Sequence, residues 1–162
     1  MDSSKEFKQI QEQSGKQPHD CSCNKCAAMC KRSPCLGTPA DILRLIDAGH
    51  VDKIGLVHWA AGMLIGIPII DMVQLDQLPN GSCIMFKDGL CTLHESGLKP
   101  TEGKLAQHEE EFQRIPTHQP LPVIVAKTWL LKDNIPAIER IVDHLIAHEN
   151  AKKNEPAAAV MG

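Results

Sequence analysis

The sequence predicts an α+β fold: a small antiparallel sheet with a metal-stapled cysteine cluster and flanking helices, followed by a C-terminal helical pair. Three features lead to this prediction. Five of the seven cysteines lie between residues 21 and 35. Segments rich in Val, Ile and Leu alternate with turn residues between residues 53 and 93, as in short strands. Apolar residues recur at helical spacing in residues 137–148.

Length and composition favour one domain with weakly structured ends. A chain of 162 residues suits a single domain plus a short appendage. Residues 1–19 are polar, and we expect a loosely ordered N-terminal arm there. Residues 20–149 would form the single cysteine-cluster domain, and residues 150–162 a disordered tail. Because the aromatic content is only 3%, the core must be mostly aliphatic, and a metal would help it to fold.

Charge and hydropathy argue against two kinds of partner. The net charge is −3 and the chain has no basic block, which argues against nucleic acid as the main partner. The longest apolar stretch, residues 59–70, is interrupted by Gly62, Gly66 and Pro68. No membrane span is therefore expected, and no feature of the sequence names a protein partner.

Cysteine usage favours metal binding in the cytoplasm. The polar N-terminal segment lacks the apolar region of a secretory signal. Seven is an odd number for a disulfide framework, and cysteines interleaved with polar residues do not form a core pattern. A thiol cluster in a reducing compartment is usually a metal site, with redox chemistry of the thiols as the alternative.

The cluster occupies residues 20–38, DCSCNKCAAMCKRSPCLGT, and contains Cys21, Cys23, Cys26, Cys30 and Cys35. In a helix over residues 23–32, Cys26 and Cys30 would lie within roughly 60° of Cys23, so three thiols would share one face. Cys21 would point elsewhere. Cys35 lies beyond a proline that cannot continue the helix. It precedes the next helix, whose N-terminus favours a thiolate, so it suits a metal ligand or a reactive thiol.

That next helix is expected to begin after Thr38 and to end before Gly49. Thr38 is a good N-cap residue, Pro39 suits the first turn, and Asp41 takes the third position of a capping box. Gly49 is the expected left-handed stop. The sequence therefore predicts a short helix directly after the cysteine cluster.

Two extended segments are expected next, at residues 53–59 and 68–75. Val, Ile and Leu are frequent in both, and glycines between them suggest turns. His58 lies in the first segment. A lone histidine in an apolar strand is more often structural or exposed than a metal ligand.

A second hairpin is expected around Lys87-Asp88-Gly89, read as a three-residue loop with a left-handed glycine. This register pairs Met85 with Cys91. Cys83 and Cys91 then lie diagonally on one face, with Cβ atoms on the order of 7 Å apart, a span that two ligands of one ion can bridge. A two-residue loop would put them on opposite faces. Shared ligation therefore predicts the longer loop.

Helices are expected in the rest of the chain. Thr101 would cap a helix over residues 102–114. Residues 123–133 and 137–148 would form the C-terminal helical pair, and the second carries apolar residues at core-facing spacing.

We expect Cys26, Cys30, Cys83 and Cys91 to be the metal ligands, with Cys23 and Cys35 as the next candidates and Cys21 as the last. Thiolates are soft ligands that suit zinc, Cu(I) or an iron–sulfur cluster, and the ligand types do not rank these. Seven thiols exceed one tetrahedral site. A second ion, an iron–sulfur cluster that uses four of them, or cysteines that are not ligands would each account for the excess.

The cysteine pattern and the segments around it resemble those of a known protein family. The cysteine-rich start, a helix that begins Thr-Pro-x-Asp-Ile, and the Cys-x7-Cys hairpin CIMFKDGLCTLHESGLKP look like the YkgJ-type zinc- or iron-chelating cysteine-cluster proteins. The likeness covers about residues 20 to 105. It implies bound zinc or iron, the iron either as an ion or as an iron–sulfur cluster, and no settled reaction.

One position departs from the family pattern. Members commonly have a further cysteine three residues after the proline of the second block, and this chain has Gly103 there. If that cysteine is a ligand, one of Cys35, Cys21, His94 or His108 would replace it.

Two functions remain open. In the first, the protein is a metal-binding module whose ion holds the cluster against the hairpin. In the second, it is a redox or metal-dependent enzyme that uses an iron–sulfur centre or a low-pKa thiol. The sequence contains no Ser-His-Asp order, phosphate loop or dinucleotide fingerprint that would define a reaction.

Overall fold

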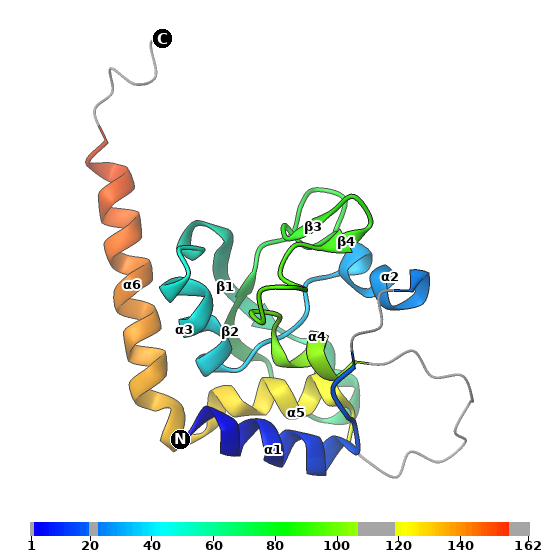
Figure 1. The fold of residues 1–162 in the computed structure, drawn as a ribbon. Coiled ribbons are helices and arrows are strands. Elements are labelled where there is room, and N and C mark those ends of the chain that lie inside the picture. Colours follow the sequence, from blue (N-terminus) through cyan, green and yellow to red (C-terminus); the bar gives the residue numbers. More distant parts are fainter. Residues whose placement is uncertain (1, 20–22, 107–118, 156–162) are drawn as a thin grey trace.

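Two separate antiparallel hairpins, surrounded by helices, make up the α+β fold in the computed structural model (Figure 1). The structure describes residues 2–19, 23–106 and 119–155. Its elements are the α-helices α1 (Ser3–Ser14), α2 (Asn24–Arg32), α3 (Pro39–Asp47), α4 (Thr101–Leu105), α5 (Leu121–Lys127) and α6 (Ile135–Lys153); the 3-10 helices η1 (Val51–Lys53), η2 (Ala61–Ile65), η3 (Thr128–Leu130) and η4 (Lys132–Asn134); and the strands β1 (Ile54–Trp59), β2 (Ile70–Leu75), β3 (Phe86–Lys87) and β4 (Leu90–Cys91).

Helix α3 is built as its capping residues predict. The Thr38 hydroxyl accepts a hydrogen bond from the Asp41 amide at 3.2 Å, and the Asp41 carboxylate accepts one from the Thr38 amide at 2.9 Å. The same carboxylate also accepts hydrogen bonds from the amide and hydroxyl of Thr101, at 2.9 and 2.6 Å. Asp41 therefore caps α3 and ties it to the start of α4.

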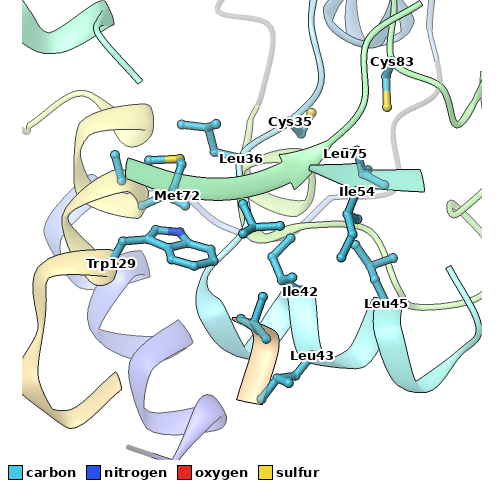
Figure 2. Packing of buried hydrophobic residues seen from close by; sticks show 14 of the residues in the cluster. Cys35, Leu36, Ile42, Leu43, Leu45, Ile54, Met72, Leu75, Cys83 and Trp129 are labelled. Atoms are coloured by element: carbon cyan, nitrogen blue, oxygen red, sulfur yellow. The ribbon is translucent and has the colours of Figure 1, made fainter. Parts of the chain in front are cut away.

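The first hairpin pairs β1 with β2 in antiparallel register from Ile54–Leu75 to Trp59–Ile70, as the two extended segments predicted. Strand β2 is the more buried of the two, and its apolar side chains lie against α3, α5 and η3. Figure 2 shows Ile54, Met72 and Leu75 among the core residues, next to side chains from α3 and to Trp129. The indole nitrogen of Trp129 donates to the Gly37 carbonyl at 2.9 Å, which fixes η3 against the segment before α3.

The N-terminal segment differs from the loosely ordered arm expected for residues 1–19, because it contains the twelve-residue helix α1. The Asp2 carboxylate caps it, and Ile10 is buried in the core. The buried Glu6 accepts a hydrogen bond from Asn134 at 2.7 Å, 128 positions along the chain. Helices α1 and α5 lie side by side (Figure 1), so tertiary contacts hold a segment whose composition is polar.

The C-terminal helical pair has other boundaries than expected. Helix α5 begins at Leu121 and ends at Lys127, and the two 3-10 turns η3 and η4 follow where residues 128–133 were expected to be α-helical. Helix α6 packs on α3 and continues to Lys153, past the start of the tail expected at residue 150. Of the described helices, none is both long enough and apolar enough to cross a membrane.

The helix expected over residues 102–114 also differs. Helix α4 begins at Thr101, which is its first helical residue and not its cap, and the chain becomes extended at Ala106. Residues 107–114 of the expected helix lie outside the described residues.

Candidate metal centre

Helix α2 carries two of the cysteines into the molecule. It begins after Cys23, so this cysteine is the N-cap residue, and it remains exposed. Cys26 is half-buried and Cys30, one turn later, is buried. This gradient follows from the helical spacing, because one face of α2 turns toward the rest of the chain.

Cys35 reaches the same region from the segment between α2 and α3. Its side chain is buried, as are those of Pro34 and Leu36. A Cβ atom added to Gly103 in α4 would lie 3.3 Å from the Cys35 sulfur. Position 103, where the sequence departs from the YkgJ-type pattern, therefore faces the Cys35 thiol directly.

The β3–β4 hairpin has a two-residue loop, so the expected three-residue loop is wrong. Phe86 pairs with Cys91, and Lys87 pairs with Leu90. Asp88 and Gly89 both have positive φ, at 52° and 80°. These are the values that a tight primed turn demands, and an Asp-Gly pair provides them at low cost. The hairpin therefore has the two-residue turn that Asp-Gly favours, and lacks the longer loop that was inferred from shared ligation by Cys83 and Cys91.

The shorter loop does not separate Cys83 from Cys91, because Cys83 lies outside the paired strands. The chain turns between Cys83 and Phe86, whose amide donates to the Cys83 carbonyl at 2.9 Å. The Cys83 amide donates to the Cys30 carbonyl at 2.8 Å, which joins this turn to the end of α2. The register of β3 and β4 therefore does not decide on which side Cys83 lies relative to Cys91.

Cys30 is the centre of the thiol cluster. Its thiol lies close enough to those of Cys35 and Cys91 for them to affect its protonation, and the charge of a Cys83 thiolate would also act on it. Three parts of the chain thus bring sulfur atoms together: α2, the segment before α3, and the second hairpin. Figure 2 shows Cys35 and Cys83 at the same margin of the apolar core, with Ile42 and Leu43 toward the other side.

These contacts favour the protonated thiols while no cation is present. Interaction with the Cys35 thiol, with a further contribution from burial, raises the pKa of Cys30 to about 12. Interaction with the Cys30 thiol and then burial raise the pKa of Cys91, and burial raises the pKa of Cys83. A cation that binds here must displace these protons, so its affinity will increase with pH.

Lys99 is a cationic residue beside the cluster. Its charge lowers the pKa of Cys91, against the larger effects that raise it. Lys99 lines both of the small cavities that flank Cys30. One, of about 10 Å³, is also lined by Cys26, Cys35 and Gly103; the other, of about 20 Å³, is also lined by Cys26, Cys91 and His94. Each has room for one particle of about the size of a water molecule.

The thiols are gathered but do not converge on one point. Among residues 2–19, 23–106 and 119–155, no group of three or more His, Cys, Asp or Glu side chains is arranged to hold a metal ion. None of the six cysteines in these ranges forms a disulfide. The donors match a thiophilic metal in chemistry and number, and a common coordination centre requires side-chain rotations of the thiols.

The other candidates from the sequence fall into three groups. His94 borders the cluster beside Cys26 and Cys91. His58 lies on β1, where its ring is hydrogen-bonded to Asp71 on the exposed face of the first hairpin. Cys21 and His108 lie outside the described residues.

Glu102 is a chemically unusual residue that sequence reasoning missed. Its side chain is buried, and one carboxyl oxygen has no hydrogen-bond partner in the described part of the chain. Burial raises its pKa to about 7, although the Leu36 backbone amide partly opposes this effect. No local pattern predicts such a group, because its burial arises only when α4 packs against the segment after Cys35.

Comparisons with protein-family models, curated proteins and solved structures found no match for this chain.

Proposed function

We propose that this protein binds zinc or iron through its cysteine cluster and uses the metal to join α2, the segment before α3 and the second hairpin. The ligands are Cys30, Cys35, Cys83 and Cys91, and Cys26 is the alternative. The observation that carries the proposal is the position of Cys30, whose thiol interacts with two other thiols from different parts of the chain.

Cys35 joins the first set of ligands because of its contacts. It interacts with Cys30 and lies against Gly103, the position at which the YkgJ-type pattern has a cysteine. The likeness to that family supports metal chelation, and the local geometry supports Cys35 as the replacement for the missing thiol. Lys99 would offset part of the negative charge of four thiolates.

A closed site of four thiolates is typical of a structural metal. In that role the ion contributes folding free energy directly, because the unfolded chain has no preformed site. The reducing cytoplasm would keep these cysteines available as thiols.

A redox or metal-dependent enzyme is the second candidate, and an iron–sulfur cluster is its more favoured form. The raised pKa values of Cys30, Cys83 and Cys91 disfavour a reactive low-pKa thiol at these positions. An iron–sulfur cluster would need the same four thiolates as a structural zinc ion.

The test is metal content and the absorption spectrum of untagged protein purified without air. A colourless protein with zinc supports the structural module, and iron with acid-labile sulfide supports the iron–sulfur form. We expect Cys30→Ser and Cys83→Ser to lose the metal. Cys23→Ser, at the exposed start of α2, is the matched control and should retain it. Full metal occupancy in both the Cys30 and Cys83 variants would refute the proposal.

A further inference from the structure

The outer edge of β1 has no partner strand in the described part of the chain, because β1 pairs only with β2. The Lys53 carbonyl accepts a hydrogen bond from the Asp76 amide at 2.9 Å, just before the strand. The antiparallel alternation that follows directs the backbone groups of Gly55, Val57 and Trp59 toward β2. Those of Leu56 and His58 point to the open edge.

This edge lacks the features that usually protect an exposed strand. Natural proteins protect open edges with lysine, proline, bulges or very short strands. Strand β1 has six residues, IGLVHW, with neither lysine nor proline, and its pairing with β2 is regular throughout. Leu56, at its middle, has 65% of its side chain exposed.

The loop that follows β1 extends this apolar surface. Met63, Leu64, Ile65 and Ile69 are all more than half exposed, and Leu64 is 98% exposed. Residues 59–70 contain no charged side chain. Together with Leu56, these residues expose on the order of 500 Å² of apolar surface, which is at the upper end for a monomer.

A second exposed apolar surface lies near the opposite end of β1. Asp76 lies against Gly55, since a Cβ atom on that glycine would be 2.9 Å from the Asp76 carboxylate, and the charge of Lys152 acts on the same carboxylate. Helix α6 also contacts η1, which directly precedes β1, so part of α6 lies near the start of β1. Val142 and Ile146 of α6 are 44% and 55% exposed.

We propose that two copies of this chain associate by antiparallel pairing of β1 with β1 of the partner, around a two-fold axis at Leu56. The outward amide and carbonyl of Leu56 then bond those of the partner's Leu56, and the two leucine side chains lie together on one face. The result is a continuous four-stranded sheet in the order β2–β1–β1–β2.

A second copy fits this surface better than an unrelated peptide for two reasons. The first is geometric: antiparallel pairing sets the η2 loop of one copy beside the start of β1 in the other, near α6, whose Val142 and Ile146 are exposed. Both apolar surfaces are then covered by one contact. The second is area, because the combined surface approaches the ~800 Å² per partner of a stable interface.

The experiment measures the oligomeric state by light scattering after gel filtration, under reducing conditions and over a wide range of protein concentrations. We expect a dimer for the natural sequence and a monomer for Leu56→Lys, since an edge lysine opposes strand pairing. The matched control is Leu130→Lys in η3, which packs against β2. Leu130 is 61% exposed, and its variant should remain dimeric.

Amide hydrogen exchange identifies the edge itself. In the dimer, the outward amides of Leu56 and His58 should be protected, and in Leu56→Lys the His58 amide should exchange at least tenfold faster while the inward amide of Val57 changes little. A monomer at all concentrations, or a Leu56→Lys protein that stays dimeric, would overturn the proposal. So would equal dissociation of both lysine variants.

Discussion

The two hairpins of this protein differ in what stabilises them. In β1–β2, six residue pairs form a ladder, and Ile70, Met72 and Leu75 are almost fully buried against helices. In β3–β4, only two residue pairs form, and the turns around them hold Cys83 and Cys91 close to Cys30. The first hairpin has a hydrophobic face, whereas the second has mainly thiol groups and a tight turn.

The difference has a physical consequence. A two-stranded hairpin is marginal in water unless its side chains pack on other elements. Burial of β2 supplies that packing to the first hairpin. The second hairpin rests on a smaller apolar contact through Met85 and Leu93, so we infer that its stability depends on the thiol cluster and on any metal that the cluster binds.

The largest expected effect is on the first hairpin. Leu75→Ala should lower the free energy of unfolding by about 2–5 kcal/mol, because it removes a side chain that is 2% exposed and leaves a cavity. Urea unfolding, followed by tryptophan fluorescence, measures the loss. Leu64→Ala, on the exposed loop, is the control and should change little. The first hairpin is stabilised by burial, so zinc should not restore the stability that Leu75→Ala removes. Full recovery of stability on addition of zinc would contradict the proposed difference between the two hairpins.

Glu102 lies in α4, between the apolar core and the thiol cluster, because α4 contacts both α5 and Cys35. Its titration therefore reports on the packing between these two regions. Its pKa of about 7 lies above its ordinary value of 4.5, so the folded protein holds this proton more tightly than the unfolded chain does. The corresponding stability is present below pH 4.5 and is lost as the pH rises through about 7. Glu102→Gln should therefore be more stable than the natural protein at pH 8, by up to about 3 kcal/mol.

Urea unfolding at several pH values from about 4 to about 8, which span the ordinary and the raised pKa of Glu102, measures this effect. The natural protein should lose stability relative to Glu102→Gln as the pH increases, and the two curves should converge at low pH. Glu6 and Asp76 also have pKa values raised by burial, but they are present in both proteins and cancel in the difference. Parallel curves would show that the Glu102 carboxyl is solvated or paired.

A chelator should destabilise the second hairpin and leave the first hairpin unaffected. Removal of the proposed metal is expected to accelerate hydrogen exchange at the amides of Cys83 and His94, which donate to the carbonyls of Cys30 and Cys91. The expected acceleration is about tenfold or more, equivalent to about 1.4 kcal/mol in local opening. The inward amide of Val57 in β1 should be unaffected. Equal acceleration in both hairpins would mean that the metal supports the whole fold and not the second hairpin alone.

The smallest expected effect comes from the tight turn. Gly89 has a φ of 80°, so Gly89→Ala should cost about 1 kcal/mol, because a side chain is strained in this conformation. If the hairpin and the metal are coupled, zinc affinity should fall about fivefold as well, which a competition titration measures. Gly49→Ala, at the end of α3 with a φ of 90°, is the control for a similar strain away from the cluster. Its zinc affinity should remain unchanged.

Local chemistry explains which elements were predictable. The Thr38–Asp41 capping box and the glycine after α3 define a helix through neighbouring residues alone. The extended segments of the first hairpin follow from their apolar content and the glycines between them. The length of the second hairpin loop was also predictable, since Asp-Gly favours a two-residue turn. The three-residue loop was expected instead because shared ligation by Cys83 and Cys91 was given more weight.

The N-terminal helix and the C-terminal boundaries were less predictable because distant residues decide them. Helix α1 is polar by composition, and it is held by burial of Ile10 and by the bond from Asn134 to Glu6. Helix α5 gives way to 3-10 turns where the Thr128 hydroxyl bonds the Val125 carbonyl and Asn134 bonds the Thr128 carbonyl. These contacts arise only in the packed chain.

The sequence by itself determined the positions of α2, α3 and the first hairpin, the abundance of thiols and the position of the tight turn, because each depends on residues a few positions apart. Only the tertiary structure decided which thiols meet. Cys35 and Cys91 lie 56 positions apart, and both contact Cys30 because α2, the segment before α3 and the second hairpin pack together. The same packing buries Glu102 and leaves the edge of β1 open, since burial depends on the arrangement of the whole chain.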